Sequence, residues 1–361
     1  MSSIRLEKVT KTYSNGKTVI ENLELEIKER SFTVLLGPSG CGKTTALRMI
    51  AGLEEVSAGQ IYIGERNVTK VDPGDRGISM VFQNYAIYPH MTVRKNIEFG
   101  LKNMKIVKEE IVKRVTQVVN MVGLKDYLNA KPSTLSGGQR QRIALSRAMS
   151  KKPQVFLMDE PLSNLDAKLR NQMRGELIDL HRELKSTFVF VTHDQIEAMT
   201  MATNIVIFNH GTIMQQGTPK EVYENPANLF VATFIGDPGM NTLELEGIGT
   251  IGFRAHKVKL MKSSHFLGVQ AAGMVMTKEM LGMDHLYRIA TGLGTVLMKG
   301  EEELNIGEQV TLYISENDLY YFDMREQRSH DVNLIESAIH RLSLMEGVTV
   351  TSDHVIGNVH G

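Results

Sequence analysis

The first part of the chain alternates short apolar runs with stretches of helical spacing. One helical stretch, from about residue 43 to 52, follows the first run after a glycine-dense turn. Continuous apolar runs of this length are typical of parallel strands buried on both faces of a sheet. The pattern predicts an α/β domain over residues 1–235, with strands at 31–36, 155–158, 188–192 and 204–208.

Helical spacing continues without strand-like runs from about residue 92 to 149. Its apolar positions include a single stripe that is typical of core packing rather than of a ligand site. We predict a mostly helical subdomain at about residues 88–150, and its stripe consists of Ile111, Val115, Val118, Val119 and Val122.

A Gly/Pro-rich segment at residues 234–241 marks a change of pattern. Short alternating runs with glycines follow it, for example at 250–253, 286–289 and 309–314. Such runs are typical of a small antiparallel β domain, barrel-like or sandwich-like. We therefore place a second, β-rich domain at residues 236–361.

Composition narrows the class of protein. The 361 residues balance 41 Lys+Arg against 41 Asp+Glu, and Cys41 is the single cysteine. This balance gives no broad basic surface for nucleic acid, and a single cysteine excludes an internal disulfide, which favours the reducing cytoplasm. The apolar runs are far shorter than the roughly 20 residues of a membrane-spanning helix.

A phosphate-binding motif lies between the first buried strand and its helix. Residues 37–44, GPSGCGKT, match G-x-x-x-x-G-K-[ST], with glycines that let backbone N–H groups wrap around phosphate oxygens. Lys43 is expected to bridge the β- and γ-phosphates, and the Thr44 hydroxyl to coordinate Mg²⁺. A plain glycine turn is the alternative, but a strand before it and a helix after it favour the phosphate site. The predicted nucleotide contacts are Gly37, Pro38, Ser39, Gly40, Cys41, Gly42, Lys43, Thr44 and Thr45.

Two acidic residues end the apolar run VFLMDE at 155–160. Asp159 at the strand end would lie beside Mg²⁺, directly or through a coordinated water. Glu160, one residue further on, could accept a proton from an attacking water. Acidic residues also end many ordinary strands, but here the pair follows a phosphate loop.

The pentapeptide LSGGQ at residues 135–139 is the most specific feature of the chain. Together with the phosphate loop and the strand-DE pair, it makes residues 1–235 resemble the ATP-binding cassette (ABC) ATPases. The resemblance implies that Leu135, Ser136, Gly137, Gly138 and Gln139 contact ATP, and that Gln83 senses Mg²⁺ and the hydrolytic water. It further implies that His193 contacts the γ-phosphate, Tyr13 stacks on adenine, and Asp166 lies in a loop between subunits.

The same resemblance implies a dimer with a second copy or a close homologue. Two chains packed head-to-tail about a two-fold axis would bury each ATP between Lys43 of one chain and Ser136 of the other. We expect ATP to favour the closed dimer and hydrolysis to open it. This movement would be passed to membrane permease subunits, and indirectly to an extracytoplasmic solute-binding protein, with the ATPase peripheral on the cytoplasmic face of the cell membrane.

The sequence around the motifs resembles that of the ATPases of bacterial sugar importers of the maltose and glycerol-3-phosphate type. That group carries a C-terminal regulatory domain of oligonucleotide-binding-fold-like (TOBE-like) β barrels. We expect no nucleic-acid binding in spite of this name, because the sequence shows no groove of basic and aromatic residues. Gly252-Phe253-Arg254 is similar to a Gly-Ile-Arg-Pro-Glu motif of that domain, although Ala255-His256 replace Pro-Glu. The tail after Asp331 matches nothing in the group.

A carbohydrate or a polyol phosphate is the expected cargo. The alternatives are a polyamine, sulfate or iron importer, or an ABC ATPase that does not transport; a single phosphate loop without heptads disfavours the last. A pure binding module would be expected to lose Lys43, Glu160 or His193. Permease helices would dock near Tyr85, Ile87, Tyr88 and Met91, unless these residues simply pack the subdomain.

Overall fold

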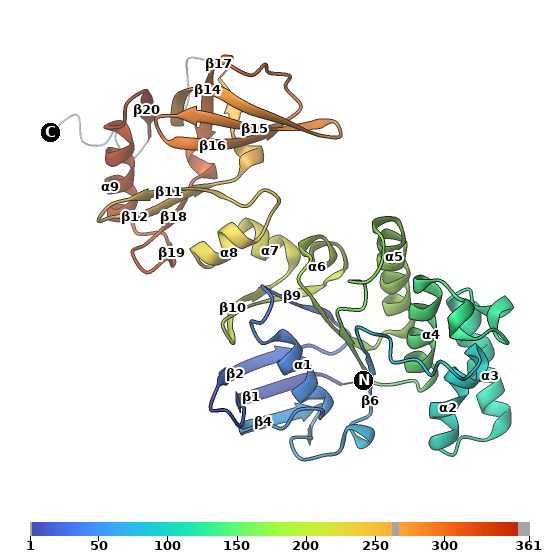
Figure 1. Cartoon of the computed structure of the whole chain (residues 1–361). Helices are drawn as coiled ribbons and strands as arrows, with labels where there is room; N and C mark the ends of the chain where they lie inside the picture. Colours follow the sequence, from blue (N-terminus) through green and yellow to red (C-terminus); the bar gives the residue numbers. More distant parts are fainter. Residues whose placement is uncertain (1, 262–266, 353–361) are drawn as a thin grey trace. The chain divides into compact units, whose positions relative to one another are not determined.

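Four of the five parallel strands in the first unit of the computed structural model are the apolar runs predicted above (Figure 1). The structure describes residues 2–261 and 267–352. Every residue of β3, β7 and β8 is buried, as two-sided burial requires. The sheet has the order β10-β9-β3-β8-β7-β6 and consists of β3 (Phe32–Leu36), β6 (Ile78–Val81), β7 (Val155–Asp159), β8 (Thr187–Thr192), β9 (Asn204–Asn209) and the antiparallel edge strand β10 (Thr212–Gly217).

The parallel strands end in register, and this alignment creates the site. Leu36 of β3 pairs with Thr192 of β8, while Asp159 of β7 pairs with Val191 of β8. Val81 of β6 pairs with Met158. Residues that follow these four strands therefore meet at one edge of the sheet, where ligands bind in open α/β folds.

An antiparallel sheet of order β2-β1-β4-β5 packs on the same core. It is formed by β1 (Ile4–Thr12), β2 (Thr18–Ile27), β4 (Ala58–Ile63) and β5 (Arg66–Asn67). Helix α1 (Lys43–Ala51) contributes Leu47 and Ile50 to a core that also contains Leu6 of β1 and Leu35 of β3. This shared packing fixes the helix that follows the phosphate loop.

The helical subdomain is present as predicted. Helices α2 (Val93–Asn103), α3 (Lys108–Met121) and α4 (Gly137–Ser150) lie together on one side of the first unit (Figure 1). The predicted stripe is buried, from Val115 at 1% exposure to Val122 at 8%. The 3₁₀ turns η2 (Lys125–Tyr127) and η3 (Pro132–Thr134) lie between α3 and α4, and η1 (Pro73–Asp75) lies between β5 and β6. Helices α5 (Ala167–Leu184) and α6 (Gln195–Met201) also belong to the first unit.

The second unit contains two antiparallel sheets around a separate core. One has the order β11-β12-β18-β19; the other has the order β13-β17-β14-β15-β16, with β20 paired to β14. Buried side chains from both sheets form a cluster that includes Tyr287, Ile314 and Tyr321. The strands are β11 (Asn241–Leu245), β12 (Gly249–Phe253), β13 (Lys259–Leu260), β14 (Gly268–Leu281), β15 (Asp284–Thr291), β16 (Gly294–Gly300), β17 (Gln309–Ser315), β18 (Tyr320–Phe322), β19 (Arg328–Ser329) and β20 (Val348–Thr351), with the turns η4 (Ala255–Lys257) and η5 (Glu316–Asp318).

The tail that resembled nothing is part of this β unit. Helix α9 (Val332–Ser343) begins at the N-cap Asp331, and Ala338 and Leu342 join the core. Strand β20 then pairs with β14. Residues 353–361 of that tail lie outside the described residues.

The first unit ends at Pro219, earlier than the predicted boundary at 235. Helices α7 (Pro219–Glu224) and α8 (Leu229–Phe234) join the β unit because Arg254 binds their backbone. The buried Arg254 guanidinium donates hydrogen bonds to the carbonyl oxygens of Tyr223, Ala232 and Ile235. The motif-like residue Arg254 thus anchors the connecting segment to the second unit.

Candidate functional site

The phosphate loop is shaped by glycines at positions where a side chain would be strained or would clash. Gly40 and Gly42 have φ values of 77° and 109°, a region that L-residues with side chains rarely adopt. A Cβ on Gly37 would lie 2.3 Å from the carbonyl oxygen of Phe208. Gly42 caps α1 without a side-chain hydrogen bond, so the first N–H groups of the helix stay available to an anion.

Lys43 lies inside this loop and is buried, with 4% of its surface exposed. Its ammonium donates hydrogen bonds to the carbonyl oxygens of Gly37 and Pro38, both at 2.8 Å. These bonds hold a positive charge against the backbone that would surround phosphate oxygens. The Sγ atom of Cys41 lies 3.7 Å from the Lys43 Nζ, and the Cys41 side chain packs in the core.

Thr44 and Asp159 meet as the sequence predicts. The Thr44 hydroxyl donates a 2.8 Å hydrogen bond to Asp159 Oδ1, and Arg48 Nε lies 3.9 Å from Asp159 Oδ2. Burial raises the pKa of Asp159, although the Thr44 hydrogen bond and the nearby Arg48 charge act in the opposite direction. A hydroxyl and a carboxylate are oxygen ligands of the kind that Mg²⁺ prefers, so this pair fits that ion.

We expect Asp159→Asn to raise the free energy of unfolding of the nucleotide-free protein at pH 7 by about 1 kcal/mol, because it removes a desolvated charge. Since the folded-state pKa is raised, the stability associated with the protonated Asp159 is complete below its unfolded pKa and is lost as the pH rises through its folded pKa. The advantage of the variant should therefore shrink as the pH falls through that folded value. Urea denaturation without Mg²⁺ at several pH values measures both effects. An equal advantage at all pH values would contradict this explanation.

Three predicted residues come together where β6, β7 and β8 end. Gln83 Nε2 donates to Glu160 Oε2 at 3.3 Å, and His193 Nδ1 lies 3.3 Å from Glu160 Oε1. Glu160 adopts a left-handed φ of 43°, and its backbone N–H donates to the carbonyl oxygen of Val191. A strained backbone conformation that its surroundings hold in place is frequent at functional sites. The cluster places a carboxylate between an amide and an imidazole beside the Thr44–Asp159 pair.

The residues of LSGGQ start helix α4. Ser136 is the N-cap, and its Oγ accepts from the Gln139 N–H, while the Gln139 side chain accepts from the Ser136 N–H. A Cβ on Gly138 would lie 2.6 Å from Leu169 Cδ2 of α5, so the absence of a side chain here lets the Leu169 side chain pack against the start of α4. Ser136 is exposed. Among the hydrogen bonds of residues 2–261 and 267–352, none joins residues 135–139 to the phosphate loop.

Two further predicted contacts lie apart from the cluster. Tyr13 follows β1 and is half-buried, with Lys11 Nζ 4.9 Å from its ring centroid. Asp166 caps α5 and accepts from the Leu169 N–H at 2.9 Å. Their predicted roles toward adenine and a second subunit remain predictions.

Three further residues contact the cluster or the Thr44–Asp159 pair. The family resemblance places two of them, Ser163 and Asn164, in the loop between subunits that contains Asp166, and no role was predicted for Arg48. Ser163 Oγ lies 3.4 Å from Gln83 Nε2, and Asn164 Nδ2 donates to the Gln83 carbonyl oxygen at 3.2 Å. Arg48 faces Asp159. The helical spacing could have identified Arg48, because it lies four residues after Thr44 on the same face of α1.

A hollow of about 780 Å³ lies between β6 and the helices α2 and α4. Of the four residues predicted to contact a permease, Tyr85 and Tyr88 line it, and Ile87 and Met91 are not among its lining residues. Tyr85 is buried, with 9% of its surface exposed. No helix in residues 2–261 and 267–352 is long and apolar enough to cross a bilayer.

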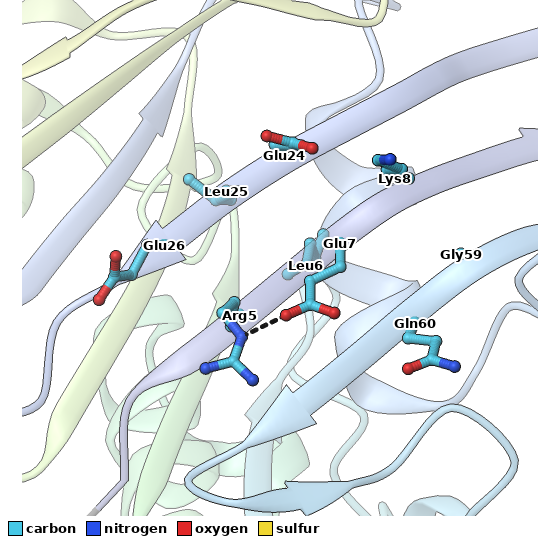
Figure 2. Close-up of a pocket in the computed structure, with 9 residues that line it drawn as sticks. All are labelled: Arg5, Leu6, Glu7, Lys8, Glu24, Leu25, Glu26, Gly59 and Gln60. Atoms are coloured by element: carbon cyan, nitrogen blue, oxygen red, sulfur yellow. Dashed lines mark hydrogen bonds and ion pairs between the residues drawn. The ribbon is translucent and has the colours of Figure 1, made fainter.

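A second concave surface lies on strands β1, β2 and β4. Figure 2 shows its charged side chains, among them Arg5 and Glu7, whose Nε and Oε1 atoms are 2.7 Å apart. Glu24 and Glu26 line it as well. None of the predicted site residues lies there, so it is separate from the nucleotide site.

Comparisons with known proteins agree with this geometry. A sequence profile described as ABC transporter matches residues 20–163. The sn-glycerol-3-phosphate import ATP-binding protein UgpC of Brucella abortus is 46% identical over 351 residues, which cover 92% of this chain and 100% of that protein. The oligosaccharides import ATP-binding protein MsmX of Bacillus subtilis is 52% identical over 276 residues, 74% of this chain and 76% of that protein.

Solved structures share the fold of the first unit. One is described as the dimeric structure of a post-hydrolysis state of the ATP-binding cassette MJ0796 bound to ADP and Pi. It is 32% identical, with a TM-score of 0.54, over 60% of this chain and 98% of that one. The structure of cbiO1 from Clostridium perfringens is 27% identical, with a TM-score of 0.56, over 61% of this chain and 89% of that one.

Proposed function

The chain belongs to the ABC transporter family as an ATP-hydrolysing import subunit, and we propose that it acts as a head-to-tail dimer that drives uptake of a carbohydrate or a polyol phosphate. The observation that carries the proposal is the meeting of Gln83, Glu160 and His193 at three aligned strand ends. Such an arrangement suits proton transfer from a water that attacks a bound phosphate.

Each residue of the cluster has a role that its contacts support. Glu160 accepts the proton of the attacking water, since its carboxylate is held between two side chains rather than paired with a fixed cation. His193 contacts the γ-phosphate and is 54% exposed at its side chain, so it can turn toward a bound nucleotide. Gln83 orients the water through its amide.

The phosphate loop binds and orients ATP. Lys43 exchanges its bonds to the Gly37 and Pro38 carbonyl oxygens for bonds to the β- and γ-phosphates. Thr44 and Asp159, with Gln83, would hold Mg²⁺, which neutralises charge on the phosphates when it is bound. Tyr13 would stack on adenine.

The exposed N-terminus of α4 supports a shared site. Ser136 and Gly137 present a helix start that is not hydrogen-bonded to the chain's own phosphate loop, and a helix N-terminus favours an anion. A second copy would bring this surface onto ATP, with Asp166 near the subunit boundary. The dimeric cassette among the solved structures is consistent with such pairing.

The names of two relatives support the proposed cargo. One imports sn-glycerol-3-phosphate and the other oligosaccharides. We place the chain on the cytoplasmic face of the cell membrane, with permease subunits docked at the hollow lined by Tyr85 and Tyr88 and a solute-binding protein acting through them. A polyamine, sulfate or iron importer would use the same nucleotide site.

Hydrolysis by the purified protein tests the assignment. We expect Mg²⁺-dependent release of phosphate from ATP, and a fall of about a hundredfold in kcat for His193→Ala, because a contact made to the transferred phosphate is lost. His210→Ala, at an exposed turn between β9 and β10, is the matched control and should keep the wild-type rate. Equal rates for wild type and His193→Ala would refute the catalytic role.

A further inference from the structure

Arg147 connects the last turn of α4 to the loop that carries Gln83. Its Nη1 donates a hydrogen bond to the carbonyl oxygen of Ala86. Its guanidinium carbon lies 4.6 Å from the centroid of the Tyr88 ring, and that ring lies 4.8 Å from the ring of Phe99 on α2. Burial lowers the pKa of Arg147, which shows that the cation is partly desolvated, and desolvation strengthens a cation–π contact.

The loop that Arg147 contacts has an unfavourable backbone conformation at two consecutive residues. Tyr85 and Ala86 are consecutive non-glycine residues with φ values of 63° and 43°. Left-handed conformations are costly for such residues and persist only where the surroundings enforce them. Burial of the Tyr85 ring holds the first residue, and the Arg147 hydrogen bond holds the second.

Gln83 lies two residues before this turn and depends on it. Its carbonyl oxygen accepts from Asn164, and its amide reaches Glu160 at 3.3 Å and Ser163 at 3.4 Å. These distances are long for hydrogen bonds, so a small displacement of the loop would break them. The position of Gln83 therefore rests on the support that the loop receives from α4.

We infer that Arg147 is a positioning residue for hydrolysis, which holds the 85–88 turn and thereby sets the place of Gln83 beside Glu160. The inference rests on the role proposed above for Gln83. Arg147 belongs to α4, the helix that begins at the LSGGQ residues. Through Arg147, this helix contacts the loop that contains Gln83. Arg147 and Tyr88 also line the hollow between β6 and the helices, so an occupant of the hollow would touch this connection.

Arg147→Ala is expected to lower kcat about tenfold while the Kd for ATP stays within about twofold of wild type, because a misplaced group costs rate without costing phosphate binding. Arg147→Lys keeps one donor and loses the planar stack, so it should restore part of the rate. Arg114→Ala is the matched control. Arg114 also donates to a main-chain carbonyl of the helical subdomain, that of Ser150 at 3.3 Å, but does not touch the 83–88 loop.

A double-mutant cycle separates positioning from plain stabilisation. If Arg147 acts through Gln83, the Arg147→Ala/Gln83→Ala double variant should have the kcat of Gln83→Ala alone. Losses that multiply, or an Arg147→Ala rate equal to that of Arg114→Ala, would overturn the inference and leave the proposed function intact. A wild-type rate for Gln83→Ala would overturn both the inference and the proposed role of Gln83. Should Arg147→Ala not fold, Arg147→Lys and Tyr88→Leu replace it in the same cycle.

Discussion

Glu160→Gln protein mixed with ATP and Mg²⁺ is expected to form a stable dimer and to hydrolyse ATP about a thousandfold more slowly than wild type, because a general base is removed. The glutamine side chain has the same shape as the glutamate, and its carbonyl oxygen can still accept a hydrogen bond from Gln83. In the wild-type protein, Gln83 Nε2 lies 3.3 Å from Glu160 Oε2. The substituted side chain can no longer take a proton from water. ATP then stays bound, and since it stabilises the closed state, the dimer persists.

Light scattering after size-exclusion chromatography measures the mass of this species. ADP in place of ATP is the control and should leave the variant monomeric. A Glu160→Gln protein that remains monomeric with ATP would exclude the head-to-tail arrangement proposed here. Slow hydrolysis by that monomer would leave the catalytic role of Glu160 in place.

The places of several residues of the candidate site follow from the apolar strands that precede them, whereas the roles expected of Gln83 and His193 come from the family resemblance. Asp159 is the last residue of β7, Glu160 follows it, and His193 follows the last residue of β8, so the aligned parallel strands bring these residues to one edge of the sheet. Thr44 joins them because α1 starts after β3 of the same sheet. The apolar pattern is strong where a strand is buried on both faces. The other residues of the site were assigned from the resemblance of the motifs to those of the ABC ATPases.

Contacts made across the fold were not predictable in the same way. The left-handed turn at Tyr85 and Ala86 contains no glycine from which it could be predicted, and the Arg147 side chain that hydrogen-bonds to Ala86 lies 61 residues further along the chain. The boundary between the two units also depends on a distant contact. In the sequence, residues 220–235 resemble a continuation of the α/β pattern, but in the structure Arg254 hydrogen-bonds to carbonyl oxygens of this segment, which belongs to the second unit. For Tyr85 the sequence left permease contact and packing in the subdomain both open, because sequence gives no sign of which side chains the α2 and α4 helices cover.

Mixing two inactive variants is expected to restore hydrolysis if each site takes its residues from both chains. Lys43→Ala removes the phosphate-loop cation, and Ser136→Arg places a bulky cation at the exposed start of α4, so each homodimer has two defective sites. In a mixed dimer one site carries both defects and the other carries neither. Random pairing makes half of the dimers mixed, so the mixture should regain about a quarter of the wild-type rate if the sites act independently.

The control for this experiment is a mixture of Lys43→Ala and Glu160→Gln chains. Both substitutions lie on the strand-end side of the nucleotide, so every site in the mixed dimer keeps one of them and no rate should return. Phosphate release measured across mixing ratios should peak at equal amounts for the first pair and stay flat for the second. A flat profile for both pairs, with dimers present by light scattering, would mean that Ser136 does not act on ATP held by the partner chain. Recovery in both pairs would mean that subunits contribute to catalysis by a route other than the start of α4.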